Sequence, residues 1–278
     1  MSNETYLQTL FSLEGRTAVI TGGSGVLGTA MAHGLARAGA RVAVVSRRIE
    51  ACQEVAEAIK AEGGKAIGVA CDVTERASLE QALARITGAF GPLDILVNGA
   101  GGNQPKATVT PDLPFFELDS QAVENVFGLN FNGTLLTCQV FGRVMAERGR
   151  GCIVNIASMA SLRPLTRVVA YGAAKAAVVN FTQWLAVHMA QEYGSALRVN
   201  AMAPGFFLTE QNRYLLTDAQ TGGYTPRGQA ILDHTPTGRL GVPDDLVGTL
   251  LWLISPAAEF VTGIVVPIDG GFSAFSGV

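Results

Sequence analysis

Three residues near the middle of the chain have types and spacings that suit proton transfer. Tyr171 and Lys175 stand four positions apart in "YGAAK", so a helix places both on one face. Ser158 precedes the tyrosine by thirteen positions and follows the apolar run "GCIVNIA". A phenol with a pKa of about 10 is a poor acid or base at neutral pH, but a neighbouring ammonium favours the phenolate and lowers that pKa. The spacing therefore predicts that Tyr171 is a general acid or base.

A glycine-rich segment near the N-terminus, "TGGSGVLG", can be read in two registers. With Gly23, Gly25 and Gly28 it is the G-x-G-x-x-G turn in which backbone amides meet a pyrophosphate at a helix N-terminus. Counted from Thr21, it is a T-G turn that closes at Gly28, with Val26 where a middle glycine would stand. In a chain with 33 glycines, either pattern alone could also be an ordinary strand-to-helix turn.

The elements that must position these residues follow from short apolar runs that alternate with helical periodicity. The runs predict buried parallel strands at 16–20, 41–46, 65–70, 93–98, 151–157, 197–202 and 263–269. Helical periodicity is found at 27–38, 49–62, 75–89, 121–147 and 172–193. The alternation predicts an α/β fold: one Rossmann-like, doubly wound domain over 1–278, with a seven-stranded parallel sheet and helices on both faces. The loops after the strands then converge on one ligand crevice.

The end of the second predicted strand bears on the nucleotide that this crevice would bind. An acidic residue there would bind a ribose 2′-hydroxyl, but the strand ends in Ser46, Arg47 and Arg48. Guanidinium groups suit a 2′-phosphate better, because they offer charged forks for phosphate oxygens. The alternative is a solvated basic loop.

Composition limits the function classes. The chain has 278 residues, is 48% hydrophobic and has a net charge of −3 without a basic stripe, so nucleic acid is not an expected partner. Its four cysteines are scattered and its histidines, His33, His188 and His234, lack a cysteine or carboxylate partner at a telling spacing. We therefore expect no metal site and no disulfide framework. There is no signal-like or membrane-length apolar segment, so we expect a cytoplasmic protein that acts on a small molecule.

Taken together and in order, these segments resemble the classical short-chain dehydrogenases/reductases over essentially the whole chain. The matching segments are "TGGSGVLG", "CDV", "NGAG", "LNFNG", Ser158, the Tyr171/Lys175 pair and "PGFFLT". The resemblance favours the register from Thr21 to Gly28, and Gly25 is then expected to supply the flexibility that Val26 cannot. Gly99 replaces the second asparagine of the family's N-N-A-G segment.

The resemblance also implies roles for individual residues. Ser158 would hold the substrate oxygen, Tyr171 would exchange the proton, and Lys175 would bind the nicotinamide ribose. Asn130 would position a water that connects the lysine to solvent, with Asn132 as the rival for this role. The implied cofactor-binding residues are Gly22, Ser24, Gly25, Val26, Leu27, Gly28, Ser46, Arg47, Arg48, Asp72, Val73, Asn98, Ala100, Gly101, Tyr171, Lys175, Pro204, Gly205, Phe207 and Thr209.

Asp72 would contact the adenine amino group, or alternatively cap the helix that begins near Glu75. The expected cofactor is NADP in preference to NAD, because Ser46 and Arg47 replace the acid of NAD-preferring relatives. The long apolar helices imply a homotetramer, as in many relatives.

The segment between the last matching motifs predicts a substrate lid at about 206–240. Asn103, Gln104, Gln211 and Arg213 are the candidate substrate-binding residues, and Arg213 is the candidate partner for a carboxylate, with a solvated surface arginine as the alternative. The run "PGFFLTEQNRYLL" resembles the D-mannonate (fructuronate) oxidoreductase and gluconate dehydrogenase branch of the family. We therefore expect an oxidoreductase of a sugar acid, with a polyol or 3-oxoacyl reductase, or a catalytically silent nucleotide sensor, as alternatives.

Overall fold

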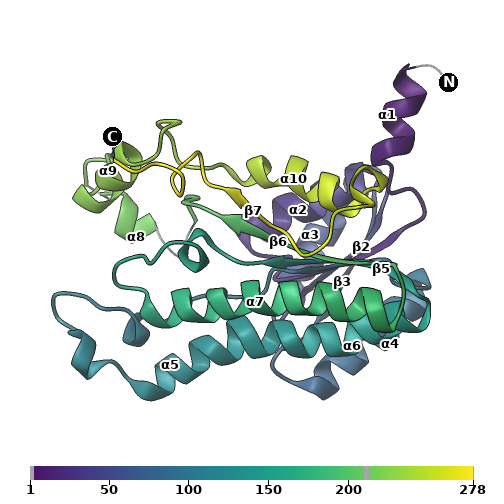
Figure 1. Ribbon diagram of the computed structural model, residues 1–278, viewed down its shortest axis with the longest axis horizontal. Helices are drawn as coiled ribbons and strands as arrows, with labels where there is room; N and C mark the ends of the chain where they lie inside the picture. The colour runs from purple at the N-terminus through teal and green to yellow at the C-terminus, as the bar shows by residue number, and fades with distance from the viewer. Residues whose placement is uncertain (1–2, 210–212, 219, 278) are drawn as a thin grey trace.

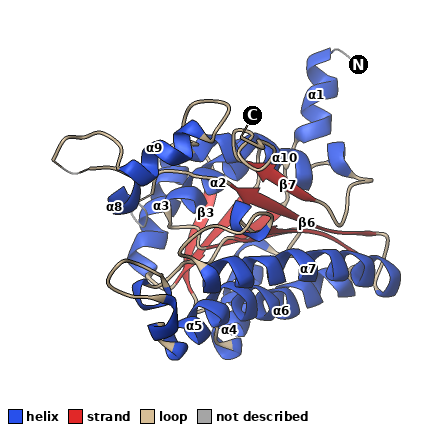
Figure 2. Ribbon diagram, turned by 60° about the vertical axis from the view of Figure 1, so that its left-hand side comes forward, coloured by secondary structure: helices blue, strands red, loops and turns tan. Residues whose placement is uncertain are grey.

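The computed structural model describes residues 3–209, 213–218 and 220–277. In this part of the chain, seven parallel strands form one sheet in the order β3-β2-β1-β4-β5-β6-β7. Helices cover both faces of the sheet (Figures 1 and 2). The strands are β1 (Thr17–Thr21), β2 (Arg41–Ser46), β3 (Lys65–Ala70), β4 (Ile95–Asn98), β5 (Arg150–Ile156), β6 (Ala196–Pro204) and β7 (Val265–Ile268). The predicted doubly wound, Rossmann-like fold is confirmed.

Ten α-helices lie in the described part of the chain. They are α1 (Asn3–Phe11), α2 (Val26–Arg37), α3 (Ile49–Ala61), α4 (Arg76–Phe90), α5 (Ser120–Phe127), α6 (Gly133–Glu147), α7 (Val169–Glu192), α8 (Arg213–Leu216), α9 (Pro226–Asp233) and α10 (Val247–Ile254). Among the described residues, no helix combines the length and apolar character needed to cross a bilayer.

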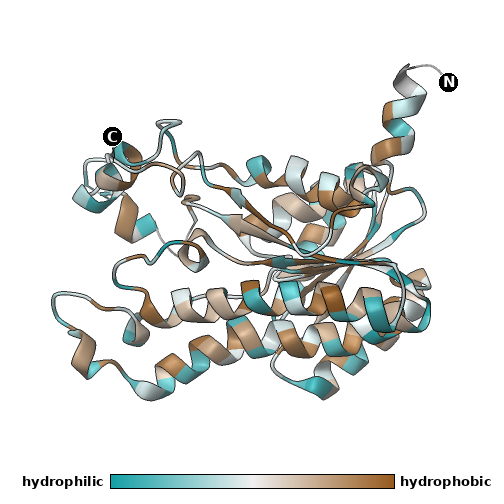
Figure 3. Ribbon diagram, viewed as in Figure 1, coloured by the Kyte–Doolittle hydropathy of each residue, from teal (hydrophilic) through white to brown (hydrophobic). Residues whose placement is uncertain are grey.

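The strands are apolar throughout because both of their faces are covered. In β1, Ala18 and Ile20 belong to the core shared with α2, α3 and α10, whereas Val19 belongs to the core shared with α4, α6 and α7. This alternation is the period of two expected for a strand. Hydrophobic segments recur along α6 and α7, which lie side by side below the sheet (Figure 3). The sheet is therefore a rigid, fully covered platform whose carboxyl edge carries the loops.

Several predicted boundaries were wrong by a few residues, and one predicted helix is interrupted. The helix predicted at 121–147 is divided into α5, a π-helical turn η3 (Gly128–Asn132) and α6. The helix predicted from 172 begins three residues earlier, at Val169, so that Tyr171 lies in its first turn. Helix α1 was not predicted. It projects away from the body of the protein (Figure 1).

The four cysteines are buried and free, as expected of structural thiols. The expectation for the histidines needs one correction. His33 Nδ1 lies 3.0 Å from the Glu62 carboxylate, a partner 29 positions away that spacing rules for a single helix do not reveal. His188 stacks on Trp184 within α7, and His234 follows the last residue of α9. Among the described residues, no three metal-ligating side chains gather in one place.

Candidate active site

The structure brings Ser158, Tyr171 and Lys175 together at the carboxyl end of β5. Ser158 follows β5 directly and begins the short helix η4 (Met159–Ser161), where its hydroxyl accepts a bond from the Ala160 amide. Tyr171 and Lys175 lie on successive turns of α7. The Lys175 side chain is only 3% exposed, and its Nζ donates to the carbonyl oxygen of Ile156 over 2.7 Å. The same Nζ lies 5.8 Å from the centre of the Tyr171 ring.

Burial opposes the charged form of both groups in this cluster. It lowers the pKa of Lys175 to about 8, because an ammonium loses hydration in the interior. Burial also raises the pKa of Tyr171, and a hydrogen bond with Ser158 acts against that rise. In the protein alone, burial outweighs the groups that favour the phenolate. The lowering of the tyrosine pKa expected from the sequence therefore requires further positive charge, which an oxidised nicotinamide would supply.

Asn130 occupies the π-helical turn η3 and connects the Ser158–Tyr171–Lys175 cluster to the loop after β4. Its side chain accepts a bond from the Gly102 amide at 3.2 Å and donates to the carbonyl oxygens of Gly102 and Val126 at 2.7 and 2.8 Å. Asn130 is fully buried, whereas its rival Asn132 is exposed. A π-bulge frees backbone groups from the helical ladder and often marks a functional position. The geometry therefore favours Asn130 over Asn132.

The loop after β4 approaches both Asn130 and Lys175 closely at Gly101. A Cβ atom at Gly101 would lie 2.7 Å from Asn130 Oδ1 and 3.2 Å from Lys175 Nζ. Any side chain at Gly101 would therefore displace a member of the cluster. Gly99, in the same loop, meets the carbonyl oxygen of Thr21 in a similar way, with 2.8 Å left for a Cβ. The unusual glycine at 99 thus suits the close contact between the first and fourth strands.

The glycine turn between β1 and α2 has the register that runs from Thr21 to Gly28. Gly22 has a φ of +67°, a conformation that favours glycine, and a Cβ on Gly28 would overlap the Gly22 carbonyl oxygen. Gly25 has a φ of −81°, which any residue can adopt, so the expectation that it replaces a flexible middle glycine is wrong. Val26 is the first residue of α2, and its side chain is exposed, with 42% of its surface accessible.

This turn fits a dinucleotide. Gly25, the N-cap residue of α2, provides no side-chain cap, so the amides of the first turn are available to an anion. A helix N-terminus also favours negative charge through its dipole. Ser24, Val26 and Leu27 lie in the same turn, as expected for residues that surround a pyrophosphate. The chain therefore offers NAD(P) a phosphate cradle at one end of the carboxyl edge and the Tyr171–Lys175 pair further along it.

The residues expected to determine the preference for NADP over NAD lie at the end of β2. The Ser46 hydroxyl lies 2.7 Å from the Ser24 hydroxyl, which joins this strand to the glycine turn. Arg47 and Arg48 are exposed just beyond it. Glu50 and Glu54 line a small pocket next to Ser24 and Arg48 (the lining also includes Ala51 and Val55). Acidic and basic groups therefore stand side by side where the adenosine ribose would lie.

Asp72, the expected adenine contact, forms a local turn. Its carboxylate accepts bonds from the amide and hydroxyl of Thr74, and the alternative role as a cap of α4 is wrong because Glu75 is the N-cap residue. Burial raises the pKa of Asp72, but the Thr74 bonds and the charge of Arg47 outweigh it and hold that pKa below its ordinary value. The carboxylate therefore stays ionised beside Arg47.

The remaining predicted cofactor residues lie along the same edge, with differing exposure. Asn98 and Pro204 are the last residues of β4 and β6. Gly205 leaves only 2.6 Å between a Cβ and the side chain of Asp269, so a larger residue would not fit there. Phe207 is 3% exposed and belongs to the sheet core, which leaves it little surface for a ligand. The others are Val73, which is buried against Gly133, and Ala100 and Thr209, which are half-buried.

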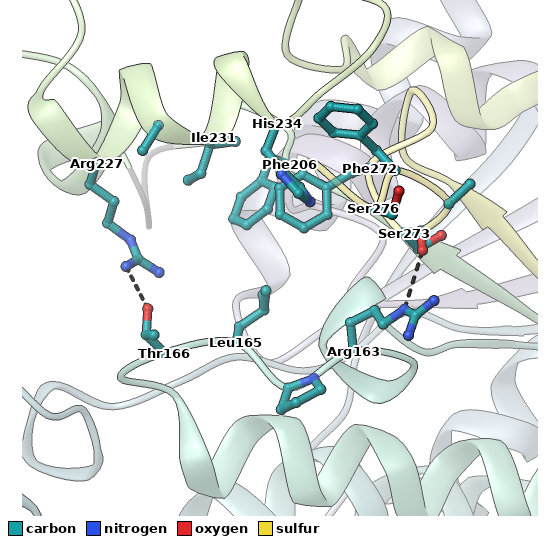
Figure 4. Close-up of a pocket in the computed structure, with 14 residues that line it drawn as sticks. Arg163, Leu165, Thr166, Phe206, Arg227, Ile231, His234, Phe272, Ser273 and Ser276 are labelled. Atoms are coloured by element: carbon teal, nitrogen blue, oxygen red, sulfur yellow. Dashed lines mark hydrogen bonds between the residues drawn. The ribbon is translucent and has the colours of Figure 1, made fainter. Parts of the chain in front are cut away.

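Of the predicted substrate residues that the structure describes, Asn103 and Gln104 lie in the loop after β4, whereas Arg213 lies on α8. Asn103 donates to the Thr108 hydroxyl, and Gln104 is half-buried in the same loop. Gln211 lies outside the described residues, and Arg213 is exposed at the start of α8. A pocket of about 620 Å³ is instead lined by residues that the sequence did not single out, among them Arg163, Arg227 and His234 (Figure 4). Loop 163–166 lies between Ser158 and Tyr171 in the chain, a position that could have indicated its importance.

A parallel sheet with a phosphate-binding turn after its first strand and a Ser–Tyr–Lys cluster with a buried lysine after its fifth strand defines a dinucleotide-dependent oxidoreductase. Residues 16–220 match the model of the short chain dehydrogenase family. The chain belongs to this family and is an NAD(P)-dependent oxidoreductase of CH–OH groups.

Individual relatives align over nearly the whole chain. The chain is 50% identical to an uncharacterized oxidoreductase, UxuB, of Bacillus subtilis (96% of this chain, 98% of the relative). It is 37% identical to the D-threitol dehydrogenase of Mycolicibacterium smegmatis (95% of each).

Two solved structures are similar over the same extent. A putative D-mannonate oxidoreductase from Haemophilus influenzae with bound NAD has a TM-score of 0.89 at 44% identity (96% of this chain, 98% of that chain). A gluconate 5-dehydrogenase from Burkholderia cenocepacia in complex with NADP and tartrate has a TM-score of 0.86 at 32% identity (97% of this chain, 99% of that chain).

Proposed function

We propose that the protein interconverts a secondary alcohol and a ketone on a sugar acid, with D-mannonate and D-fructuronate as the expected pair. The observation that carries the reaction type is the Ser158–Tyr171–Lys175 cluster, whose lysine is buried beside the equally buried Asn130. The substrate class is supported by the relatives that are named for mannonate and gluconate. The polar run that follows β6 resembles the same branch of the family.

The chain's own residues perform the proton transfer and the positioning. In alcohol oxidation, Ser158 holds the substrate oxygen, and the phenolate oxygen of Tyr171 takes the hydroxyl proton. Lys175, held by the Ile156 carbonyl, keeps a positive charge near that phenol. An oxidised nicotinamide held beside this cluster would supply the hydride acceptor, which the protein's own groups do not provide. Asn130 fixes the loop at Gly102, and its turn would hold the water that connects Lys175 to solvent.

The reaction is tested by absorbance at 340 nm with a panel of substrates. The panel contains D-mannonate, D-fructuronate, D-gluconate, neutral polyols and a hydrophobic ketone, with both cofactors. We expect the highest kcat/KM for a sugar acid. A preference for polyols would support the second candidate, which the D-threitol dehydrogenase relative favours. A preference for the hydrophobic ketone would favour a 3-oxoacyl type of reductase, and cofactor binding without turnover would favour a nucleotide sensor.

For the cofactor, we propose that NADP is preferred and NAD accepted. Support comes from Arg47 and Arg48, which are exposed beyond β2, and from Ser46 in place of an acid. The neighbouring Glu50 and Glu54 limit the preference, because they weaken the attraction for a 2′-phosphate. Arg47→Ala should reduce kcat/KM for NADPH more than for NADH. An NADH preference in the wild type that survives this substitution would refute the proposal.

A further inference from the structure

The 620 Å³ pocket lies at the carboxyl edge of the sheet, where it is lined by the loop that connects Ser158 with Tyr171 along the chain. Loop 163–166, helix α9 and the C-terminal segment 272–276 surround it, with Phe206 on its wall (Figure 4). Loop 163–166 leaves from Ser158 and η4 and returns to Tyr171, so one wall of the pocket belongs to the catalytic loop itself. The volume is in the range of about 300–1,000 Å³ that is typical of small-molecule sites.

The polar side of this pocket carries positive charge without a balancing carboxylate. Arg163 and Arg227 line it, and no aspartate or glutamate is among its lining residues. Arg227 donates to the Thr166 hydroxyl at 3.0 Å, and Arg163 Nε donates to the Ser273 carbonyl oxygen at 3.2 Å. These bonds use few of the five donors of each guanidinium. Throughout the described ranges, neither arginine forms an ion pair.

Nearby acidic groups are engaged elsewhere. On α9, the Asp233 carboxylate accepts from the side chain of Gln229 over 2.8 Å. Near the C-terminal wall, the Asp269 carboxylate accepts from the amides of Gly271 and Ser273. The loop between Ser158 and Val168 contains no acidic residue. Among the described residues, no carboxylate pairs with these guanidinium groups, which suits them to an anion that comes from outside the protein.

A second arginine acts on Arg227 from the catalytic loop. Burial, followed by the charge of Arg167, lowers the pKa of Arg227, so two cations repel each other at this wall. Arg167 itself has a φ of +75°, the one non-glycine residue with positive φ in the described part of the chain. Such a conformation is costly for a residue with a side chain and is often found at functional sites. Its carbonyl accepts the Val109 amide at 2.9 Å, which holds the loop in place.

The opposite wall of the pocket is aromatic. His234 lies 4.8 Å from the ring of Phe272 and 4.9 Å from that of Phe275, and Phe206 lies 5.1 Å from Phe272. In Figure 4 the rings of Phe206, His234 and Phe272 lie on the side of the pocket opposite Thr166. An arginine side and an aromatic side together suit a small organic anion with a carbon skeleton better than a bare inorganic ion.

We propose that Arg227, assisted by Arg167 and Arg163, binds the carboxylate of the substrate in this pocket. The inference rests on the proposed sugar-acid function and assigns the carboxylate to a residue other than Arg213. A guanidinium suits this task because it can form two parallel charged hydrogen bonds with a carboxylate. The bound anion also relieves the repulsion between Arg227 and Arg167. The pocket then orients the acid so that its far carbons extend toward Ser158 and Tyr171.

Matched substrates and variants test this assignment. We would measure kcat/KM for D-mannonate and D-gluconate against mannitol and sorbitol, which carry a CH₂OH group in place of the carboxylate. For Arg227→Gln we expect a loss of about 10- to 100-fold for the acids, mainly in KM, and little change for the polyols. Arg227→Lys, which keeps the charge but not the fork, should lose less. Arg167→Asn removes a charge but tolerates the positive φ, and should lose a few-fold.

Direct binding separates the two proposals. Calorimetry with tartrate in the presence of saturating NADPH, the reduced form that cannot accept a hydride from it, should show weaker binding to Arg227→Gln, while the exposed Arg85→Gln on α4 should bind as the wild type does. If the wild type oxidises only polyols, the proposed function fails, but loss of tartrate binding in Arg227→Gln still supports the anion pocket. If acids are substrates and Arg227→Gln stays within threefold for both readouts, or Arg213→Gln shows the loss instead, the assignment to Arg227 is wrong.

Discussion

The carboxyl edge of the sheet around Ser158, Tyr171 and Lys175 (the catalytic edge) and the segment 206–240 predicted as a substrate lid (the lid region) hold their functional groups by different means. At the catalytic edge, backbone contacts fix the side chains: Asn130 bonds to both backbone groups of Gly102, and Lys175 bonds to the Ile156 carbonyl. In the lid region, side chains on short elements meet side chains or backbone of distant segments, as Arg227 meets Thr166 across 61 positions. The first arrangement tolerates almost no variation, because glycines leave no room for change. In the lid region, by contrast, substitution of a single side chain can change which ligand is bound.

This difference separates chemistry from recognition. Proton transfer requires a geometry that is held within fractions of an ångström, and buried backbone contacts provide it. Substrate choice requires only that suitable groups line a cavity, and elements such as α8 and α9 can supply these without disturbing the sheet. Perturbing the two regions should therefore have unequal consequences for rate, stability and specificity.

The largest effect is expected for the proton-transfer residue. Tyr171→Phe should lower kcat by about 10² to 10⁴, because general acid–base catalysis contributes about that much and the cluster offers no second acid or base of suitable position. Cofactor affinity, measured by nucleotide fluorescence, should change little. A kcat within threefold of the wild type would show that the catalytic edge does not act through this phenol, and would remove the contrast between the two regions.

The glycine turn tests whether backbone contact governs the catalytic edge. Gly28→Ala places a methyl group against the Gly22 carbonyl, so α2 must shift, at a cost of about 1–3 kcal/mol or more, and cofactor affinity should fall. Gly25→Ala is the matched control, because its Cβ would lie 3.3 Å from the same oxygen and its φ is ordinary. Urea denaturation and cofactor titration would measure both effects. Equal behaviour of the two variants would contradict the register assigned to this turn.

Lys175 couples the catalytic edge to pH in two ways. Its pKa falls from 10.5 to about 8 on burial. Between these values the unfolded chain keeps the proton that the folded chain has lost, so raising the pH from 8 to 10.5 should stabilise the wild type by about 3 kcal/mol. Lys175→Met should lack this rise in the free energy of unfolding, which urea titrations at several pH values would measure. Parallel pH curves for both proteins would show that the ammonium carries no burial cost.

The same variant should shift catalysis. Without the nearby ammonium, the phenolate of Tyr171 is less favoured, so the rising limb of alcohol oxidation should move to higher pH. Cofactor binding should also weaken, because the ribose contact expected of Lys175 is lost. An unshifted limb with normal cofactor affinity would mean that Lys175 has a structural role only.

Much of the catalytic edge could be predicted from the sequence because it is encoded locally. The Tyr171–Lys175 spacing follows from the helical period, and the strand runs are apolar because both faces are buried. The π-helical turn at Asn130 could not be predicted, since its cause is a set of bonds to Gly102, 28 positions away. The contact between His33 and Glu62 could not be predicted for the same reason, because it joins distant segments. The sequence also suggested that Gly25 needs a backbone conformation open only to glycine, but its φ is ordinary.

The lid region was less predictable because its pocket is made by contacts between distant segments. The polar residues after β6 led us to predict Gln211 and Arg213 as substrate-binding residues. In the structure, Arg213 is exposed on α8, whereas Arg227 lines the pocket. Nothing in the sequence around Arg227 marks it, because its neighbours Thr166 and Arg167 come from the catalytic loop. Substrate-binding residues of this kind can be identified only once the fold is known.

The smallest effect on catalysis is expected from assembly, which involves the other end of the catalytic helix. The first turns of α7 carry Tyr171 and Lys175, whereas its last turns expose Trp184 and Val187, each with 57% of its surface accessible. Trp184 stacks on His188 at 4.7 Å, which makes a flat apolar surface of the kind that partners cover. We expect a homotetramer in which these faces of α6 and α7 pair with another copy. Light scattering should give four times the chain mass of 29.0 kDa.

Trp184→Glu should lower that mass while turnover per chain stays within a few-fold, and the exposed Arg85→Glu on α4 should keep the wild-type mass. A wild-type mass of one chain at micromolar concentration would refute the tetramer, and a collapse of turnover together with the mass would show that the catalytic edge depends on the partner's support rather than on its own backbone contacts.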